Sequence, residues 1–169
     1  HGVRLLDKLT TLSADVGLGD YPPTAAAAAV FEELQARIDE QIAAFEALVA
    51  RYHQRLAALP LDPPATPAGT RPSWHLYVVQ LRLEELRTGR DEIFRALRAE
   101  NIGVNVHYIP VHHLGFYSRL LGKQPGDFPR ADRAYSRILT LPLFPAMTDA
   151  DVDLVGTALE KVLRRYGSA

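Results

Sequence analysis

The chain has 169 residues, of which 47% are hydrophobic and 23% charged, and its formal net charge is -1. That length fits one domain, or one compact domain with an extension. The near-zero charge gives no electrostatic reason to expect binding to nucleic acid or to an anionic membrane. The chain has no cysteine, which excludes disulfides, thiolate nucleophiles and cysteine-ligated zinc. No long apolar run or signal peptide is visible, so a cytoplasmic protein is expected.

The first sixty residues predict two helices. Leucines at positions 5, 6, 9 and 12 predict a short amphipathic helix before the glycines and prolines of residues 17–23. Thr24 is the expected N-cap of a long helix over residues 25–59. At 1.5 Å per residue this helix is about 50 Å long, so part of it should project or pack on another subunit. Its apolar stripe is Phe31, Leu34, Ile38, Ile42, Phe45, Leu48, Val49, Tyr52 and Leu56.

The remaining residues predict an α+β fold, in which helices lie on one side of a small sheet. Thr88 and Asp91 are expected to cap one helix, which Asn101 ends in the left-handed conformation. Thr148 and Asp151 form the capping box expected for the last helix. The expected elements are a proline-rich linker (61–72), a strand (74–83), a helix (89–100), a strand (102–109), helices (114–121 and 131–139), an extended edge segment (141–145) and a helix after residue 148.

Residues 101–113 contain the candidate binding residues. Apolar residues alternate with polar ones from Ile102 to Tyr108, which is typical of a strand with one buried face, and Pro110 should end that strand. Three of the six histidines lie here, and they could contact a ligand, bind a metal or have an ordinary structural role. No carboxylate lies in the same stretch, so no metal site is predicted.

The residues by themselves do not identify an enzyme. A lysine that forms a Schiff base needs a desolvated pocket, and none of Lys8, Lys123 and Lys161 has such a setting in the sequence. No phosphate-binding, dinucleotide-binding or hydrolase motif is present. No catalytic residue is therefore predicted.

From residue 74 onward the chain resembles the C-terminal domain of the DegT/DnrJ/EryC1/StrS sugar aminotransferases. Within that family it looks most like the branch that makes UDP-4-amino-4,6-dideoxy sugars for pseudaminic acid. The residues that match are S-W-H-L-Y-V-V (73–79), N-I-G-V-N-V-H-Y-I-P-V-H (101–112), G-D-F-P (126–129) and L-P-L-F-P-A-M-T-D-A-D-V (141–152).

The resemblance implies a fold and a division of the chain. The fold is the C-terminal small domain of fold-type I aminotransferases, a small and mostly antiparallel sheet with helices packed on one side, preceded by a long amphipathic helix. Residues 1–60 would form the N-terminal segment and the connecting helix, and residues 61–169 the small domain.

The resemblance also implies a reaction for the intact enzyme. With pyridoxal phosphate, such an enzyme moves an amino group from an amino acid such as glutamate to a UDP-linked 4-keto-sugar. The side chains implied in the sugar pocket are His107, Tyr108, His112 and His113.

The chain by itself is expected to be inactive and to bind no cofactor. The family's large domain, with its Schiff-base lysine, is absent, and Gly19 and Tyr21 stand where the family has a cofactor-facing Asn and an Arg. The alternative is a non-catalytic scaffold or self-association module, natural or redesigned, that dimerises through the long helix. Docking onto a separately encoded large domain is a third reading.

Overall fold

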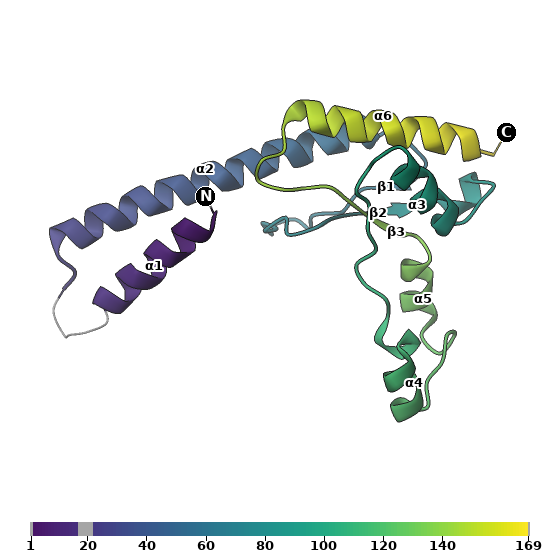
Figure 1. Ribbon diagram of the computed structural model, residues 1–169, viewed down its shortest axis with the longest axis horizontal. Coiled ribbons are helices and arrows are strands. Elements are labelled where there is room, and N and C mark those ends of the chain that lie inside the picture. The colour runs from purple at the N-terminus through teal and green to yellow at the C-terminus, as the bar shows by residue number, and fades with distance from the viewer. Residues whose placement is uncertain (1, 17–21, 169) are drawn as a thin grey trace. The chain divides into compact units, whose positions relative to one another are not determined.

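The computed structural model describes residues 2–16 and 22–168 (Figure 1). The chain forms two compact units, His1–Ala44 and Phe45–Ala169, whose boundary falls inside one long helix. This division by contacts differs from the predicted domain boundary at residue 60, which stays a prediction. The predictions for Gly19 and Tyr21 lie outside the described residues.

The first unit contains helix α1 (Gly2–Val16) and the beginning of helix α2 (Ala25–Leu56). Both predicted helices are therefore confirmed, with α2 ending three residues earlier than expected. Thr24 is the N-cap of α2, because its Oγ1 accepts a hydrogen bond of 3.1 Å from the backbone N–H of Ala27.

A three-stranded antiparallel sheet lies in the second unit, in the order β1-β2-β3. Its strands are β1 (Leu61–Asp62), β2 (Tyr77–Leu81) and β3 (Ile138–Leu141). In the register, Leu61 faces Leu81 and Val79 faces Leu139. The predicted linker therefore begins with a short strand, and the strand predicted at 74–83 is shorter than expected.

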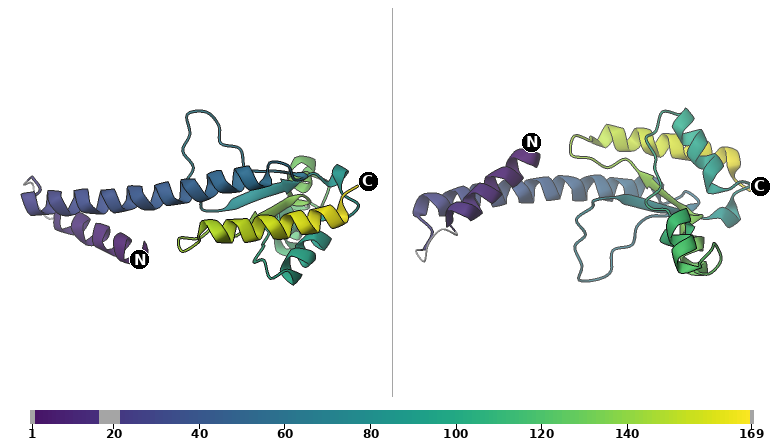
Figure 2. Two further views of the ribbon diagram at one scale, coloured as in Figure 1. Left: turned by 90° about the horizontal axis from the view of Figure 1, so that it is seen from above. Right: turned by 60° about the horizontal axis from the view of Figure 1, so that its bottom comes forward.

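The helices α3 (Arg90–Ala99) and α6 (Asp149–Tyr166) complete the core, and α3 packs against α6 and β3. Figures 1 and 2 show α6, in yellow, beside the sheet. The predicted α+β fold is confirmed. A short 3₁₀ helix, η1 (Leu83–Glu85), follows β2. Within the described part of the chain, no helix combines the length and the apolar character that a membrane crossing requires.

The helix ends test the predicted caps. Thr148 and Asp151 form the expected capping box at the start of α6. Asn101 has φ 62°, so its predicted left-handed conformation is confirmed. The prediction for Thr88 is wrong, because Gly89 is the N-cap of α3 and no side chain bonds to that helix start.

The core consists of the inward faces of the sheet, α3, α6 and the last turns of α2. Tyr52 and Tyr77 stack in it with ring centroids 4.7 Å apart, and Tyr52 donates a 2.7 Å hydrogen bond to the carbonyl of Pro142. Arg51 joins α2 to α6 through ion pairs with Asp149 and Asp153. The fully buried leucines and isoleucine of the core are Leu56, Leu61, Leu81, Ile93, Leu97, Leu139, Leu141, Leu159 and Leu163.

The strand predicted at residues 102–109 is not formed. Only Asn105 pairs, through two backbone hydrogen bonds to Thr140 of β3, and this is an isolated bridge. The side chain of Asn105 bonds to the N–H of Val106 at 2.8 Å and so replaces a ladder partner. Tyr108, predicted on the buried face, is exposed.

Residues 111–135 form an arm that extends from the sheet in Figure 1. It contains the 3₁₀ helix η2 (Val111–His113) and the helices α4 (Gly115–Leu121) and α5 (Pro129–Tyr135). The helix predicted at 114–121 is confirmed. The one predicted at 131–139 is wrong at its end, because residues 138–141 pair with β2 and form β3, so the extended segment starts earlier than residue 141.

Candidate functional site

His107 is held by hydrogen bonds on both ring nitrogens. Its Nδ1 lies 3.0 Å from Thr140 Oγ1, and its Nε2 lies 3.1 Å from Asn105 Nδ2. Asn105 accepts from the N–H of Val106 through Oδ1, so its amide nitrogen is the group that faces His107. The ring therefore accepts at Nε2 and donates from Nδ1 to Thr140.

A cleft of about 590 Å³ opens beside this network. Asn105, His107 and Thr140 give one part of its wall polar character, while the exposed side chains of Phe144 and Leu154 are apolar. Clefts that combine apolar walls with a few fixed polar groups are typical of small-molecule sites. Hydrogen bonds to Thr140 of β3 and to Asn105 fix the position of His107 in the wall of this cleft.

Tyr108 is the most exposed of the predicted site residues, with 69% of its surface accessible. Its ring lies at 4.7 Å from that of His107, edge to face. Because most of the side chain is exposed, its phenol can meet a ligand or a second protein surface. His107, by contrast, already uses both nitrogens within the chain.

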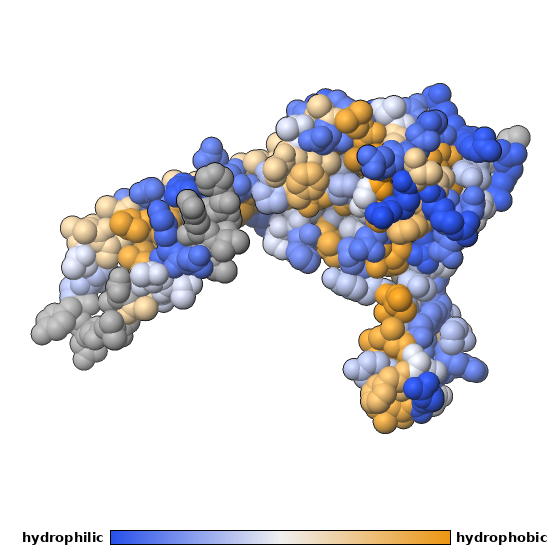
Figure 3. Space-filling model, in the orientation of Figure 1, coloured by the Kyte–Doolittle hydropathy of each residue, from blue (hydrophilic) through white to orange (hydrophobic). Residues whose placement is uncertain are grey.

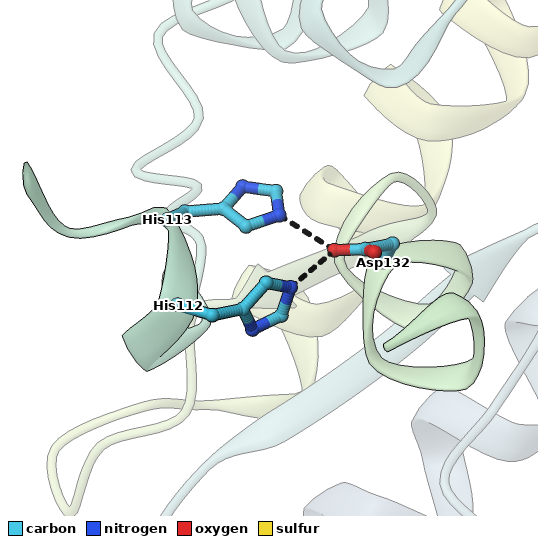
Figure 4. A group of neighbouring side chains, drawn as sticks. All are labelled: His112, His113 and Asp132. Carbon is cyan, nitrogen blue, oxygen red and sulfur yellow. Dashed lines mark hydrogen bonds and ion pairs between the residues drawn. The ribbon is translucent and has the colours of Figure 1, made fainter. Parts of the chain in front are cut away.

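His112 and His113 have other partners than His107 and converge on Asp132 (Figure 4). His112 Nε2 lies 2.7 Å and His113 Nε2 2.5 Å from the same Asp132 oxygen, Oδ1. The other carboxylate oxygen accepts the N–H of Gly126 at 2.8 Å. The histidines belong to η2 and the aspartate to α5, so this histidine–aspartate cluster joins two elements of the arm.

The cluster keeps its carboxylate ionised. Partial burial by itself raises the pKa of Asp132, but hydrogen bonds from the Gly126 N–H and from the two imidazoles outweigh it and lower the pKa to about 2. At neutral pH an ionised Asp132 can only accept, so each imidazole donates from Nε2.

The four predicted site residues therefore fall into two groups, and the fold adds three residues to them. Asn105 and Thr140 support His107, and Asp132 joins the other two histidines. Asn105 lies two positions before His107, so the sequence contained a signal for it. Asp132 lies twenty residues from His112, and no local pattern links them.

The residues of this chain do not fit a cofactor site that needs a Schiff-base lysine. Lys8, Lys123 and Lys161 are all exposed, and Lys161 pairs with Glu100 at 2.8 Å. None of the three therefore lies in the desolvated pocket that a Schiff-base lysine needs.

The sequence profile of the DegT/DnrJ/EryC1/StrS aminotransferase family matches residues 21–160. The match covers most of the chain, so this protein belongs to that family, and the predicted resemblance is confirmed.

Two relatives show how much of a family member the chain represents. It is 38% identical over 130 residues to the spore coat polysaccharide biosynthesis protein SpsC of Bacillus subtilis, a match that covers 76% of this chain and 33% of SpsC. It is 40% identical over 91 residues to the uncharacterized protein MJ1066 of Methanocaldococcus jannaschii, covering 54% of this chain and 24% of that protein. The chain spans about a third or less of these relatives.

Solved structures of sugar aminotransferases share the fold. The sugar aminotransferase Spr1654 of Streptococcus pneumoniae, in its pyridoxal-phosphate form, matches with a TM-score of 0.69 and 27% identity over 84% of this chain and 36% of that one. DesV of S. venezuelae, solved with a ketimine intermediate, matches with a TM-score of 0.64 and 32% identity over 80% of this chain and 35% of its own.

Proposed function

We propose that this chain is the C-terminal small domain of a pyridoxal-phosphate-dependent sugar aminotransferase of the cytoplasm. The observation that carries the proposal is the family match over residues 21–160, in a chain that spans only about a third of its relatives. The intact enzyme would move an amino group from an amino acid such as glutamate to a UDP-linked 4-keto-sugar. The remaining two thirds would supply the Schiff-base lysine.

Within that enzyme, we propose that the cleft beside β3 forms part of the sugar pocket. His107 would act as a fixed polar wall, because both of its nitrogens are already engaged. Tyr108 does not line the cleft, but its ring contacts His107, and its exposed phenol would contact the sugar from beside it. His112 and His113 bond to Asp132 and do not line this cleft, so they would reach the sugar only in a part of the pocket that the rest of the enzyme completes.

The chain is expected to show no transamination by itself when glutamate, pyridoxal phosphate and a keto-sugar are added. A ligand titration followed by amide NMR tests what it retains. With a UDP-linked sugar, we expect localised shifts at residues 104–108 and at Thr140, and smaller shifts in Tyr108→Ala. His75→Ala, an exposed histidine outside the cleft, is the matched control. The absence of shifts at millimolar ligand would contradict a sugar surface in this chain.

A second proposal concerns self-association. Leu9 and Leu12 of α1 and Ala27, Ala28 and Phe31 of α2 line an almost wholly apolar groove in the first unit. A second copy of the chain would bury it. Phe31→Glu should then convert a dimer to a monomer in sedimentation, while Glu32→Gln should not. A wild-type chain that stays monomeric at all concentrations would contradict this proposal.

A further inference from the structure

The histidine–aspartate cluster, His112, His113 and Asp132, has the composition of a metal site. Residues 101–113 contain no carboxylate, which is why their sequence predicts no metal there, but the fold brings in Asp132. The three ligand atoms lie within 4.8 Å of one another. Two imidazoles and one carboxylate form a ligand set that divalent transition metals use.

The way the chain presents the two rings favours convergence on one point. Neighbouring residues in a strand point to opposite faces, but His112 and His113 lie in a 3₁₀ turn. Their rings are nearly perpendicular, at 89°, with centroids 4.5 Å apart. In Figure 4 both Nε2 atoms point at the same carboxylate oxygen.

The carboxylate is oriented from behind. The N–H of Gly126 holds Asp132 Oδ2, so Oδ1 is left to face the histidines. Outer hydrogen bonds of this kind fix the direction of metal ligands in known sites. The side chains of His112, His113 and Asp132 are only 7%, 19% and 20% exposed, so bulk water competes little for the site.

The spacing needs only a small expansion to admit an ion. Zinc binds imidazole nitrogen and carboxylate oxygen at about 2.0–2.2 Å, which separates ligands in a tetrahedron by about 3.3 Å. The present distances of 2.7 and 2.5 Å from the nitrogens to Oδ1 are shorter by less than about 1 Å. To bind the ion, the side chains would have to lengthen both nitrogen–oxygen distances by that amount and hold the two Nε2 atoms, now within 4.8 Å of each other, about 3.3 Å apart.

We propose that the cluster binds one divalent transition-metal ion of the zinc class, through His112 Nε2, His113 Nε2 and Asp132 Oδ1, with water as the remaining ligand. The ion replaces the proton on each Nε2, so a bound neutral ring carries its proton on Nδ1 and a doubly protonated ring releases one proton to solvent. Imidazole ligands favour zinc over magnesium or calcium. This inference does not depend on the proposed aminotransferase function.

The ion would act as a clip on the arm. It would join η2 to α5 and so hold together the two ends of the segment that contains α4. Hydrophobic side chains are prominent on the arm surface in Figure 3, and several in α4 are exposed. They include Phe116, Tyr117, Leu120 and Leu121. A metal tie would hold this surface in place without an apolar core beneath it.

Calorimetric titration of the full chain, first freed of metal with a chelator, tests the site with zinc chloride alone. We expect one ion per chain. His113→Ala should weaken binding by more than about 100-fold, because loss of an outer-shell partner alone costs about 10- to 100-fold. His75→Ala, which removes an exposed histidine outside the cluster, should leave binding unchanged, and magnesium should not bind.

A second measurement on the unmutated chain keeps the test independent of variant folding. In ring-nitrogen NMR, His112 and His113 should donate from Nε2 without metal and carry the proton on Nδ1 with zinc. Slower hydrogen exchange at residues 114–131 should accompany the change. The proposal is overturned if zinc fails to bind, if His113→Ala binds zinc as the unmutated chain does, or if both rings keep their Nε2 protons at saturating zinc.

Discussion

The sheet core and the arm differ in which kinds of side chain they bury and which they expose. In the core, leucines from β2, β3 and α6 lie inside and charged side chains such as Arg51 and Asp153 lie outside. In the arm His112 is buried and His113 half-buried, while the large apolar residues of α4 are exposed. The core is thus held by packed apolar side chains, while the arm joins its elements through a polar cluster and exposes apolar side chains.

The helices of the arm also differ from α6 of the core in how their first turns are capped. Helix α6 of the core begins with a capping box, whereas α4 and α5 begin at Leu114 and Phe128 without a side-chain cap. Unpaired N–H groups at a helix start leave its first turn dependent on its surroundings. Helix α3 of the core also has no side-chain cap, so the arm differs from the core mainly in the large apolar side chains that α4 exposes.

The largest test of the comparison is a matched pair of leucine substitutions. Leu159→Ala removes a side chain of the core that is 0% exposed, and it should lower the free energy of unfolding by about 2–5 kcal/mol. Leu120→Ala removes one in the arm that is 66% exposed, and its effect should stay within about 0.5 kcal/mol. Urea denaturation measures both, and equal losses would contradict the division.

A smaller effect is expected at the helix caps. Thr148→Ala removes the cap of α6 and should lower the free energy of unfolding by about 1 kcal/mol. Thr88→Ala is the control, because Thr88 stands one residue before the N-cap of α3 and makes no cap bond there. If both substitutions cost the same in thermal or urea unfolding, the structural assignment of the caps is wrong.

The smallest expected effect is on how the free energy of unfolding depends on pH in acid. Hydrogen bonds from Arg51 lower the pKa of Asp153, against partial burial, and the charges of Arg51 and Arg55 add to the lowering. A carboxyl whose folded pKa is depressed stabilises the fold above its unfolded pKa of about 3.9, and this contribution is lost as pH falls through the folded pKa. Asp153→Asn should therefore reduce the acid sensitivity of unfolding below about pH 4.

The control for this pH dependence is Asp127→Asn. Asp127 is an exposed residue of the arm and accepts a hydrogen bond from the N–H of Gln124. Unfolding curves recorded from about pH 5 down to about pH 2.5 give the slopes. An unchanged slope in Asp153→Asn would show that the ion pair with Arg51 adds nothing to the link between α2 and α6.

The sequence predicted those parts of the chain whose signals are local. The helix α2, the capping box of Thr148 and the left-handed Asn101 depend on residues within a few positions of one another, and all three are confirmed. The motifs around residues 101–112 and 141–152 also predicted the family. A helix closes its hydrogen bonds between residues four apart, so its sequence contains most of what it needs.

Only the tertiary structure decided which segments pair and which polar groups meet. Residues 102–109 have the alternation of a strand but find a partner at Asn105 alone, while residues 138–139 leave a helical pattern to pair with β2. Asp132 reaches His112 and His113 across about twenty residues. Strand pairs and ligand clusters form between residues that are distant in the sequence. A local pattern can therefore indicate that a segment could form a strand or that a side chain could be a ligand, but it does not indicate which other segment or side chain it meets.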